Sequence, residues 1–305
     1  MISVVIPVKN GGTDLVRCLN AIAGQRIEEE VEVVVVDSES QDGSAALAQR
    51  FGARVHSIPA SEFHHGRTRN LGAQLARGEI LVFTSQDAYA ASDTWLARLT
   101  TPFRDDDTIA GVYGRQLPHE DARPPERYFL DFLYGPDRRL QRLEPEGELT
   151  FEVTLFSNVN SALPRTVWEA YPFADDIVMS EDQEWSRRVL LAGRAIAYEP
   201  EAAVYHSHTY SVAGALRRFF DSGASAERSY VDDGARSRAA LWKAGASYAQ
   251  GEIGWLWTTG QRRWIPYAAV YELAKFAGLQ LGRRHRLLPV ALKSRLSAYP
   301  EHWKS

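Results

Sequence analysis

Residues 31–37 read VEVVVVD, a nearly unbroken run of β-branched side chains that ends in Asp37. Such a run is typical of a strand buried on both faces, as in the middle of a parallel sheet. A similar run, ISVVIPV, stands at residues 2–8, and EILVFTSQDA follows at residues 79–88. Because segments with helical periodicity separate these runs, the first 110 residues predict a series of βαβ units.

Three helices and one more strand complete this predicted series. The first helix runs from Thr13 to about Gly24, with an apolar face formed by Leu15, Cys18, Leu19 and Ile22. Two further helices are expected at residues 42–52 and 68–78, each ending in glycine, with a strand at residues 53–58 between them. The predicted fold class is α/β, a Rossmann-like nucleotide-binding arrangement with a mostly parallel central sheet flanked by helices.

The chain changes character after this series. Residues 115–150 are rich in proline, arginine and acidic residues, and they predict a long excursion with one aromatic helix around Tyr128–Tyr134. A helix at residues 180–194 and a strand at residues 195–208 then restore regular structure. After Ser211 helical patterns dominate.

The charge divides at the same point. Residues 1–210 carry 20 basic and 32 acidic side chains, a net of −12, whereas residues 211–305 carry 15 and 7, a net of +8. We therefore predict a catalytic-sized α/β domain at 1–210 and a helical, basic C-terminal region at 211–305. The basic region suggests contact with an anionic partner such as phospholipid headgroups, and docking on the acidic body is the open alternative. No nucleic acid partner is expected.

Composition and the N-terminus bear on class and compartment. Hydrophobic residues at 45% and charged residues at 24% exclude disorder, collagen and coiled coil. The single cysteine, Cys18, cannot close an intrachain disulfide, and MISVVIPVKN at the N-terminus is no signal peptide. A cytoplasmic location is expected, with a peripheral position on the inner face of the membrane as an option. Residues 266–281 are too short for a confident membrane span; a helix in the membrane surface and a buried helix both stay open.

Polar residues follow the predicted strands, where ligands bind in an open parallel sheet. They are Pro7, Lys9 and Asn10 after the first strand, Asp37 and Asp42 after the second, and Gln86 and Asp87 after the fourth. The turn PVKNGGTD lacks the GxGxxG fingerprint of dinucleotide oxidoreductases, and the chain has no GxxxxGK[ST] loop. A metal ion held by a carboxylate is therefore the better candidate anchor for a diphosphate.

Three further pairs of residues have side chains suited to chemistry, and each pair also has a plain structural interpretation. Glu181 and Asp182 begin a helix, where acids also complement the macrodipole. The second pair, His206 and His208, flanks Ser207 at a strand end and can face a divalent ion together, although a single such histidine is more often structural. The third pair lies ahead of a helix, where an arginine fork matches phosphate oxygens unless it is simply solvated: Arg67 and Arg69.

These segments, in this order, resemble the family 2 glycosyltransferases of the GT-A fold over roughly residues 1–210. The resemblance rests on SVVIPVKN, VVVVDSESQDGS, GRTRNLGAQLARGEILVFTSQDA, EDQEWSRRVLLAG and YEPEAAVYHSH. Within it, FHHGRTRN and TSQDA are most similar to bacterial rhamnosyltransferases that use dTDP-rhamnose to build surface polysaccharides.

The resemblance implies a donor site. Asp37 matches the acid that reads the nucleotide base, Pro7 and Lys9 line that pocket, and Arg69 lies near the nucleotide and diphosphate. Asp87 matches the last acid of the metal-binding DxD motif, which implies Mg²⁺ or Mn²⁺ as cofactor. Gln86 stands where many relatives have Asp, which leaves the metal with Asp87, the diphosphate, water and His206 as a further ligand.

The resemblance also implies catalytic and acceptor residues. Asp182 matches the catalytic base, Glu181 its neighbour, and Trp185 the aromatic residue of the acceptor site. Asn158 and Asn160 lie in the segment that usually lines the sugar and acceptor pocket.

The expected function is inverting transfer of a sugar, L-rhamnose from dTDP-rhamnose, to a saccharide or lipid-linked glycan acceptor in surface polysaccharide synthesis. A donor that is a UDP- or GDP-sugar is one alternative. A catalytically weak relative that only binds nucleotide sugar or polysaccharide is another, because Gln86 removes a carboxylate. A nucleotidyltransferase is disfavoured, since the glycine-rich basic loop after the first strand is missing.

Overall fold

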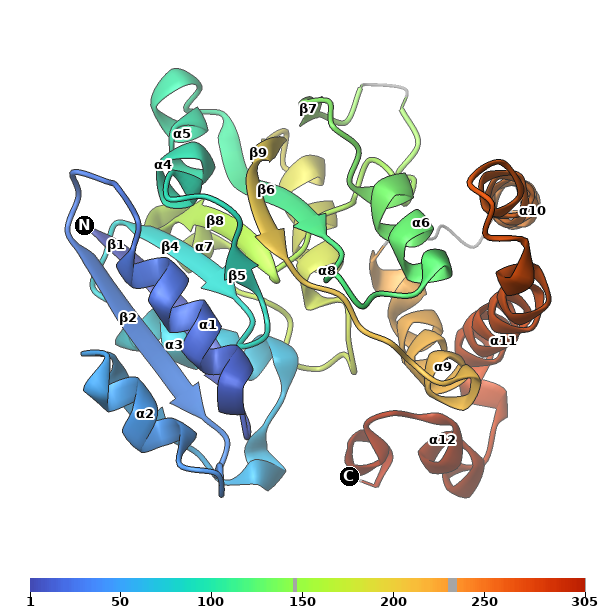
Figure 1. Ribbon diagram of the computed structural model, residues 1–305, viewed down its shortest axis with the longest axis horizontal. Helices are drawn as coiled ribbons and strands as arrows, with labels where there is room; N and C mark the ends of the chain where they lie inside the picture. The colour runs from blue at the N-terminus through green and yellow to red at the C-terminus, as the bar shows by residue number, and fades with distance from the viewer. Residues whose placement is uncertain (145–146, 230–234, 305) are drawn as a thin grey trace.

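A computed structural model describes residues 1–144, 147–229 and 235–304. In this part of the chain nine strands form one sheet, in the order β3-β2-β1-β4-β8-β6-β9-β5, with β7 paired to β9 (Figure 1). The strands are β1 Ile2–Val8, β2 Val31–Asp37, β3 Arg54–Ser57, β4 Ile80–Thr84, β5 Tyr89–Ala90, β6 Ile109–Leu117, β7 Arg139–Gln141, β8 Asn160–Pro164 and β9 Ala195–Tyr205.

The two halves of the sheet differ in strand direction. Strands β3, β2, β1 and β4 are all parallel, as the unbroken apolar runs predict. Strand β8 then lies antiparallel to both β4 and β6, whereas β6 and β9 are parallel to each other. The predicted α/β class is confirmed, but the mostly parallel arrangement holds only for the first half.

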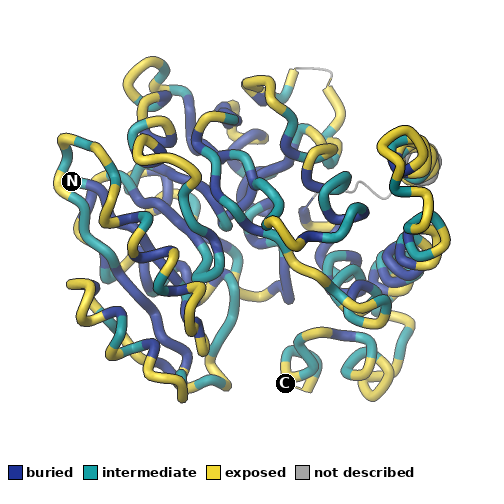
Figure 2. Tube along the Cα trace, viewed as in Figure 1, coloured by how far each residue is buried: buried dark blue, intermediate teal, exposed yellow. Residues whose placement is uncertain are grey.

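Helices cover both faces of the sheet because successive strand residues point to opposite sides. From β1, Val4 and Ile6 pack under α1 (Gly12–Ala23), α2 (Ser44–Arg50) and α4 (Trp95–Thr100), which α5 (Pro102–Asp105) follows. Val5 packs on the other face, under α3 (His65–Leu75), α6 (Pro124–Leu133), α7 (Arg165–Ala170) and α8 (Glu181–Leu191). Figure 2 shows the buried sheet between these more exposed helices. The predicted buried face of the first helix is confirmed at Leu15, Cys18, Leu19 and Ile22.

The chain after the sheet is helical. It forms α9 (Val212–Ser229), α10 (Ala235–Thr258), α11 (Ile265–Arg283) and α12 (Val290–Leu296). Ser229 Oγ of α9 donates to the Ser180 carbonyl at 3.3 Å, and Arg228 of the same helix pairs with Asp176, so α9 docks on the α/β part of the chain. Among the described residues, we find no helix with the length and apolar character needed to cross a bilayer.

Helices α9 and α11 approach each other through glycine. A Cβ atom at Gly278 would overlap the Leu216 carbonyl of α9, and one at Gly282 would overlap the Phe220 carbonyl. Any larger side chain must push the two backbones apart, because the obstructing atoms belong to a helix and not to a flexible side chain. The glycines therefore set the distance between α9 and α11.

We expect Gly278→Ala to lower the free energy of unfolding by about 1–3 kcal/mol, since it overpacks this contact. The matched control is Gly254→Ala in α10, where an added Cβ meets nothing within 4 Å. Alanine there should stabilise by roughly 0.5–1 kcal/mol through helix propensity. Urea denaturation measures both, and equal stability of the two variants would contradict the close approach.

Candidate active site

A cleft of about 1840 Å³ opens where the sheet meets the C-terminal helices. Its polar floor carries Glu181, Asp182, His206 and His208. Its walls come from the excursion after β6, including α6, and from α9, α10 and α11. Those walls are largely apolar, with Phe129, Phe132, Leu133, Phe151, Leu273, Phe276 and Leu279 among the lining residues. A few polar groups in a large apolar cleft are typical of a ligand site.

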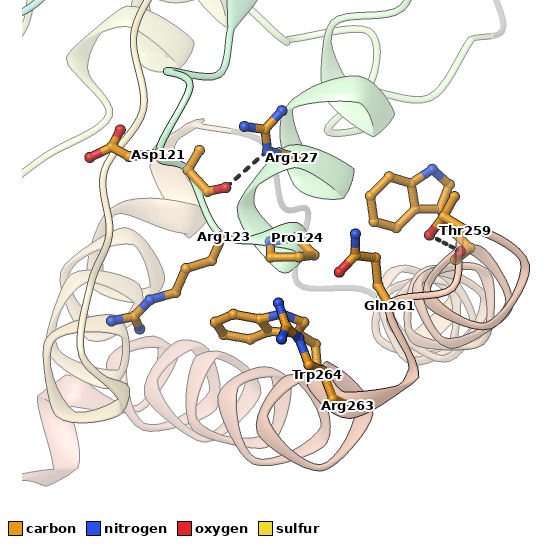
Figure 3. A pocket seen from close by; sticks show the side chains of 10 residues that line it. Asp121, Arg123, Pro124, Arg127, Thr259, Gln261, Arg263 and Trp264 are labelled. Carbon is orange, nitrogen blue, oxygen red and sulfur yellow. Dashed lines mark hydrogen bonds between the residues drawn. The ribbon is translucent and has the colours of Figure 1, made fainter.

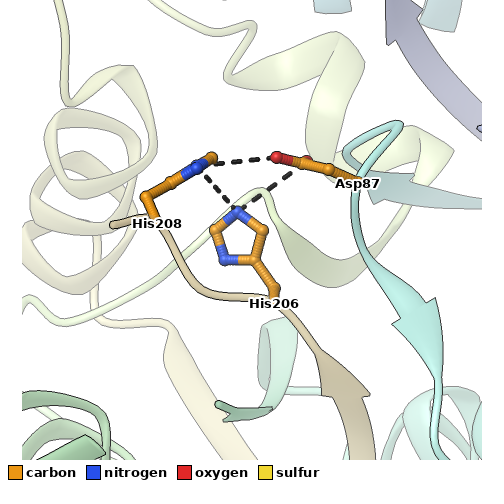
Figure 4. Close-up of side chains that lie close together, drawn as sticks. All are labelled: Asp87, His206 and His208. Atoms are coloured by element: carbon orange, nitrogen blue, oxygen red, sulfur yellow. Dashed lines mark hydrogen bonds and ion pairs between the residues drawn. The ribbon is translucent and has the colours of Figure 1, made fainter. Parts of the chain in front are cut away.

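Asp87, His206 and His208 form a compact cluster (Figure 4). Asp87 follows β4 and the histidines follow β9, so two strand ends supply the three side chains. His206 Nε2 lies 3.1 Å from His208 Nε2, and the Asp87 carboxylate lies 3.8 Å from His206 Nε2 and 3.6 Å from His208 Nε2. All the ligand atoms lie within 4.8 Å of one another, which is the spacing of side chains around a single cation.

Gln116, at the end of β6, fixes the orientation of His206. Its amide nitrogen donates to Tyr134 Oη at 2.8 Å and to Ser157 Oγ at 3.0 Å, so its carbonyl oxygen faces His206 Nδ1 at 2.8 Å. With Gln116 in this orientation, His206 carries its proton on Nδ1, which leaves the Nε2 lone pair pointing at the cluster.

Burial lowers the pKa of His206 to about 4, and it lowers the pKa of His208 as well. Both rings are thus neutral near pH 7, the form that binds a metal. One carboxylate oxygen and two imidazole nitrogens are ligand atoms that a divalent metal ion can take. The residues present therefore fit a divalent cation, with His208 added to the predicted set.

Gln86 does not belong to this cluster. Its side-chain oxygen accepts from the Lys9 backbone N–H at 2.8 Å, and its amide nitrogen donates to the Lys9 carbonyl at 3.1 Å. The glutamine thereby ties the end of β4 to the end of β1. The sequence indicated only that Gln86 removes a carboxylate from the metal site. In the structure Gln86 connects the loop after β4 to the loop after β1.

Asp37 lies at the end of β2 and is buried. Its Oδ2 accepts from the Ser40 backbone N–H at 3.1 Å, while Oδ1 has no hydrogen-bond partner among the described residues. A buried carboxylate oxygen without a donor is costly, so it suits an N–H group supplied by a ligand. Pro7 is half-buried and Lys9 exposed on the neighbouring strand end. Asp42, by contrast, accepts from the Gly12 and Ser44 backbone and holds the loop.

Glu181 and Arg69 form a buried ion pair. Arg69 Nη1 donates to Glu181 Oε1 at 2.9 Å, and both side chains are less than one-tenth exposed. Burial opposes ionisation of Glu181, but the charge of Arg69, His65 and the hydrogen bonds to the carboxylate together outweigh it and hold the pKa of that carboxyl below its usual value. Arg69, predicted near the diphosphate, is thus already neutralised by Glu181. Arg67 is exposed.

Asp182, the next residue, has a raised pKa, whereas the pKa of Glu181 is lowered. Its Oδ2 accepts from the Asn158 backbone N–H at 3.2 Å and its Oδ1 from the Gln183 N–H at 2.9 Å. Burial, and the negative charge of Glu181 beside it, raise the pKa of Asp182 to about 7. Two adjacent carboxyls with pKa values pushed apart are the arrangement expected of an acid/base site.

Three predicted acceptor residues do not line the cleft. Asn158 is fully buried and donates to Glu181, and Asn160 is fully buried between the Trp95 ring nitrogen and the Ala202 carbonyl. Trp185 is also fully buried, because Phe156 and Phe173 cover its ring. The structure therefore corrects the predicted acceptor contact of Trp185: its ring packs in the core and the cleft wall is made by other residues.

A second, smaller pocket of about 630 Å³ lies on the other side of α6. Pro124, Gln261 and Trp264 lie around it, with arginines at its rim (Figure 3). Arg127 is engaged there with the Ala122 carbonyl at 2.9 Å. This pocket shares no lining residue with the cleft, so it is separate from the site that contains Asp182, His206 and His208.

Residues 3–165 match the family model described as glycosyl transferase family 2, which covers more than half of the chain. The chain belongs to this family. As a glycosyltransferase, it is 30% identical over 308 residues to the O-antigen chain rhamnosyltransferase RfbN of Salmonella typhimurium, covering all of this chain and 96% of that protein. The O-antigen chain rhamnosyltransferase WbaN of Salmonella anatum is 29% identical, over 99% and 96% of the two chains.

Solved structures agree in fold. A mannosyltransferase of Pyrobaculum calidifontis, solved with GDP-Man and Mn²⁺, superposes on this glycosyltransferase with a TM-score of 0.57 at 20% identity, over 99% of this chain and 85% of the other. TarS of Staphylococcus aureus, residues 1–349, gives a TM-score of 0.54 at 14% identity, over 93% and 91%. The GT-A fold predicted from the sequence is therefore confirmed.

Sequence reasoning missed several residues of the transferase cleft. Gln116 stands at a strand end, so the rule that selected Asp37 and Asp87 also applied to it, but residues 109–117 were not predicted as a strand. Ser157 and Tyr134 carry no sequence signal, since they act through contacts with Gln116. Arg218 of α9 lines the cleft, but the sequence does not distinguish it from the other basic residues of the C-terminal region.

We expect Arg69→Met to destabilise the transferase by about 3–5 kcal/mol, because it leaves the Glu181 charge buried without its partner. The double variant Arg69→Met/Glu181→Gln removes both charges and should recover part of that loss. Arg54→Met, which breaks the more exposed pair with Glu32, should cost less than about 1 kcal/mol. Urea denaturation compares the three; equal losses in the single and double variants would contradict a buried ionic interaction.

Proposed function

We propose that this glycosyltransferase moves L-rhamnose from dTDP-rhamnose to a saccharide or lipid-linked glycan acceptor in surface polysaccharide synthesis, with inversion at the anomeric carbon. The observation that carries the reaction type is the pairing of Asp182 with His206 and His208 in one cleft, where Asp87 completes the histidine cluster. Similarity to two O-antigen chain rhamnosyltransferases over nearly the whole chain supports the choice of sugar.

Asp87, His206 and His208 would hold the divalent cation, Mg²⁺ or Mn²⁺. Such an ion supplies Lewis-acid neutralisation of charge on the departing diphosphate. Asp37 would bind the base through its unpartnered Oδ1. Gln86 would hold the loop after β1 in place through its hydrogen bond with the Lys9 backbone.

Asp182 would act as the general base. It takes the proton of the acceptor hydroxyl while that oxygen attacks the anomeric carbon, and the bond from this carbon to the diphosphate oxygen breaks. A pKa near 7 suits this task, because a base must be ionised yet still bind a proton usefully at the working pH. Glu181, held charged by Arg69, keeps that pKa high.

The proposal includes a peripheral position at a membrane, which a lipid-linked acceptor requires. Leu287 and Val290 are exposed beside the basic run RRHR at residues 283–286. Exposed apolar side chains flanked by arginines are the composition of helices that lie in an anionic membrane surface.

The donor is tested by calorimetric titration of the purified protein with dTDP-rhamnose, UDP-sugars and GDP-sugars, each with and without Mn²⁺. We expect dTDP-rhamnose to bind most tightly, and only with the metal. Asp87→Ala should weaken that metal-dependent binding, whereas His56→Ala, at an exposed histidine on β3, should not. Absence of binding by every nucleotide would overturn the proposed function.

We expect Asp182→Asn to lower turnover by about 10²- to 10⁴-fold while leaving donor binding intact, as loss of a general base does. In the wild type, kcat/KM should rise with pH through about 7 and level off above it, because Asp182 must lose its proton to act. The remaining activity of the variant should lack that rise. Radiolabelled sugar transfer measures both profiles.

The control is Asp175→Asn, at an exposed aspartate on the segment that leads to α8. It should leave kcat and the pH profile unchanged. A wild-type rate in Asp182→Asn would remove Asp182 from catalysis, and donor binding without any transfer by the wild type would favour a binding relative.

A further inference from the structure

Five cationic side chains line the cleft in the described part of the chain: Arg69, Arg139, Arg142, Arg218 and Lys275. Three of them have carboxylate partners at 2.8–2.9 Å: Arg69 with Glu181, Arg142 with Asp106, and Lys275 with Glu272. Arg139 donates to the Leu133 carbonyl at 3.0 Å and lies over the Tyr198 ring, 4.3 Å from its centroid. Four of these cations are therefore engaged within the protein.

Arg218 differs from the other four. Among the described residues, its guanidinium makes one hydrogen bond, from Nη1 to the Ser222 hydroxyl at 3.3 Å, and no carboxylate lies within ion-pair distance. Asp221, close to it on the same helix, accepts from the Ser297 hydroxyl and the Ala298 backbone N–H. A partly exposed guanidinium without a counter-charge is free to bind an anion that comes from outside the chain.

The position of Arg218 is set by contacts on both sides of it. Ser222 also contacts Met179 Sδ at 3.3 Å, and Ser229 binds the Ser180 carbonyl, so α9 is held beside the start of α8. Arg218 lines the same cleft as Asp182, His206 and His208.

We propose that Arg218 binds the diphosphate of the nucleotide sugar and stabilises the departing nucleoside diphosphate; this inference rests on the proposed function. When the bond from the anomeric carbon to the diphosphate oxygen breaks, its electron pair stays on that oxygen, which gains negative charge. Arg218 remains protonated throughout and donates hydrogen bonds to the phosphate oxygens, while the acceptor proton goes to Asp182. The planar fork of arginine matches phosphate oxygens in geometry as well as charge.

The role falls to Arg218 because Arg69 cannot fill it. Arg69 is held by Glu181 in a buried pair, and withdrawing it toward a phosphate would leave that carboxylate buried and unpaired. Arg218 of the C-terminal region therefore supplies a positive charge for the diphosphate, because Glu181 neutralises the charge of Arg69 in the α/β part of the chain.

The test is calorimetric titration of dTDP and of dTMP, in the presence of Mn²⁺, into the full chain and its variants. Arg218→Gln should bind dTDP about 10- to 100-fold more weakly, the usual loss of hydrogen bonds to a charged group. The loss for dTMP, which lacks the β-phosphate, should be much smaller. Arg218→Lys, which keeps the charge but not the fork, should fall between wild type and Arg218→Gln.

The matched control is Arg217→Gln, at an exposed arginine that precedes Arg218 on α9 and does not line the cleft. It should bind dTDP as the wild type does. Equal dTDP affinity in wild type and Arg218→Gln would overturn the inference alone, as would an equal loss for dTDP and dTMP, which indicates a merely structural role. Failure of the wild type to bind dTDP, UDP or GDP would instead overturn the proposed function itself.

Discussion

The site depends on one buried ion pair, between Arg69 of α3 and Glu181 at the start of α8. Without it the carboxylate of Glu181 could not remain charged in the protein interior. The charge it preserves acts on the neighbouring carboxyl and, together with burial, brings Asp182 to a pKa of about 7. A structural contact between two helices thereby contributes to the raised proton affinity of the Asp182 carboxyl. The same contact neutralises the charge of Arg69, whose Nη1 donates to Glu181.

The metal cluster depends on strand order. Asp87 follows β4, while His206 follows β9, which lies parallel to β6 on the other side of β8. Because β8 runs antiparallel between them, β4, β6 and β9 all deliver their carboxyl ends to one edge. Gln116, at the end of β6, is then in place to orient His206. A sheet of mixed direction thus collects ligands and their support from three strand ends.

Sequence reasoning recovered what local pattern determines. The apolar run before Asp37 predicts a central strand, and polar residues after such strands predict a ligand edge; Asp87 and His206 do lie together there. It failed where the outcome depends on a partner distant in sequence. Nothing in the residues around Gln86 predicts its clamp on Lys9, and the burial of Trp185 follows from Phe156 and Phe173. The antiparallel direction of β8 likewise comes from topology and not from its five residues.

The glycine contact between α9 and α11 distinguishes residues that set the spacing of the helices from residues that only line the cleft. Because backbone meets backbone at Gly278 and Gly282, these two positions fix how closely α11 approaches α9, the helix that carries Arg218. Tyr248, Glu252 and Leu273 of α10 and α11 line the cleft and do not contact these glycines. A substitution that is meant to reshape the cleft wall should therefore begin at α10 and α11 and leave the glycines untouched.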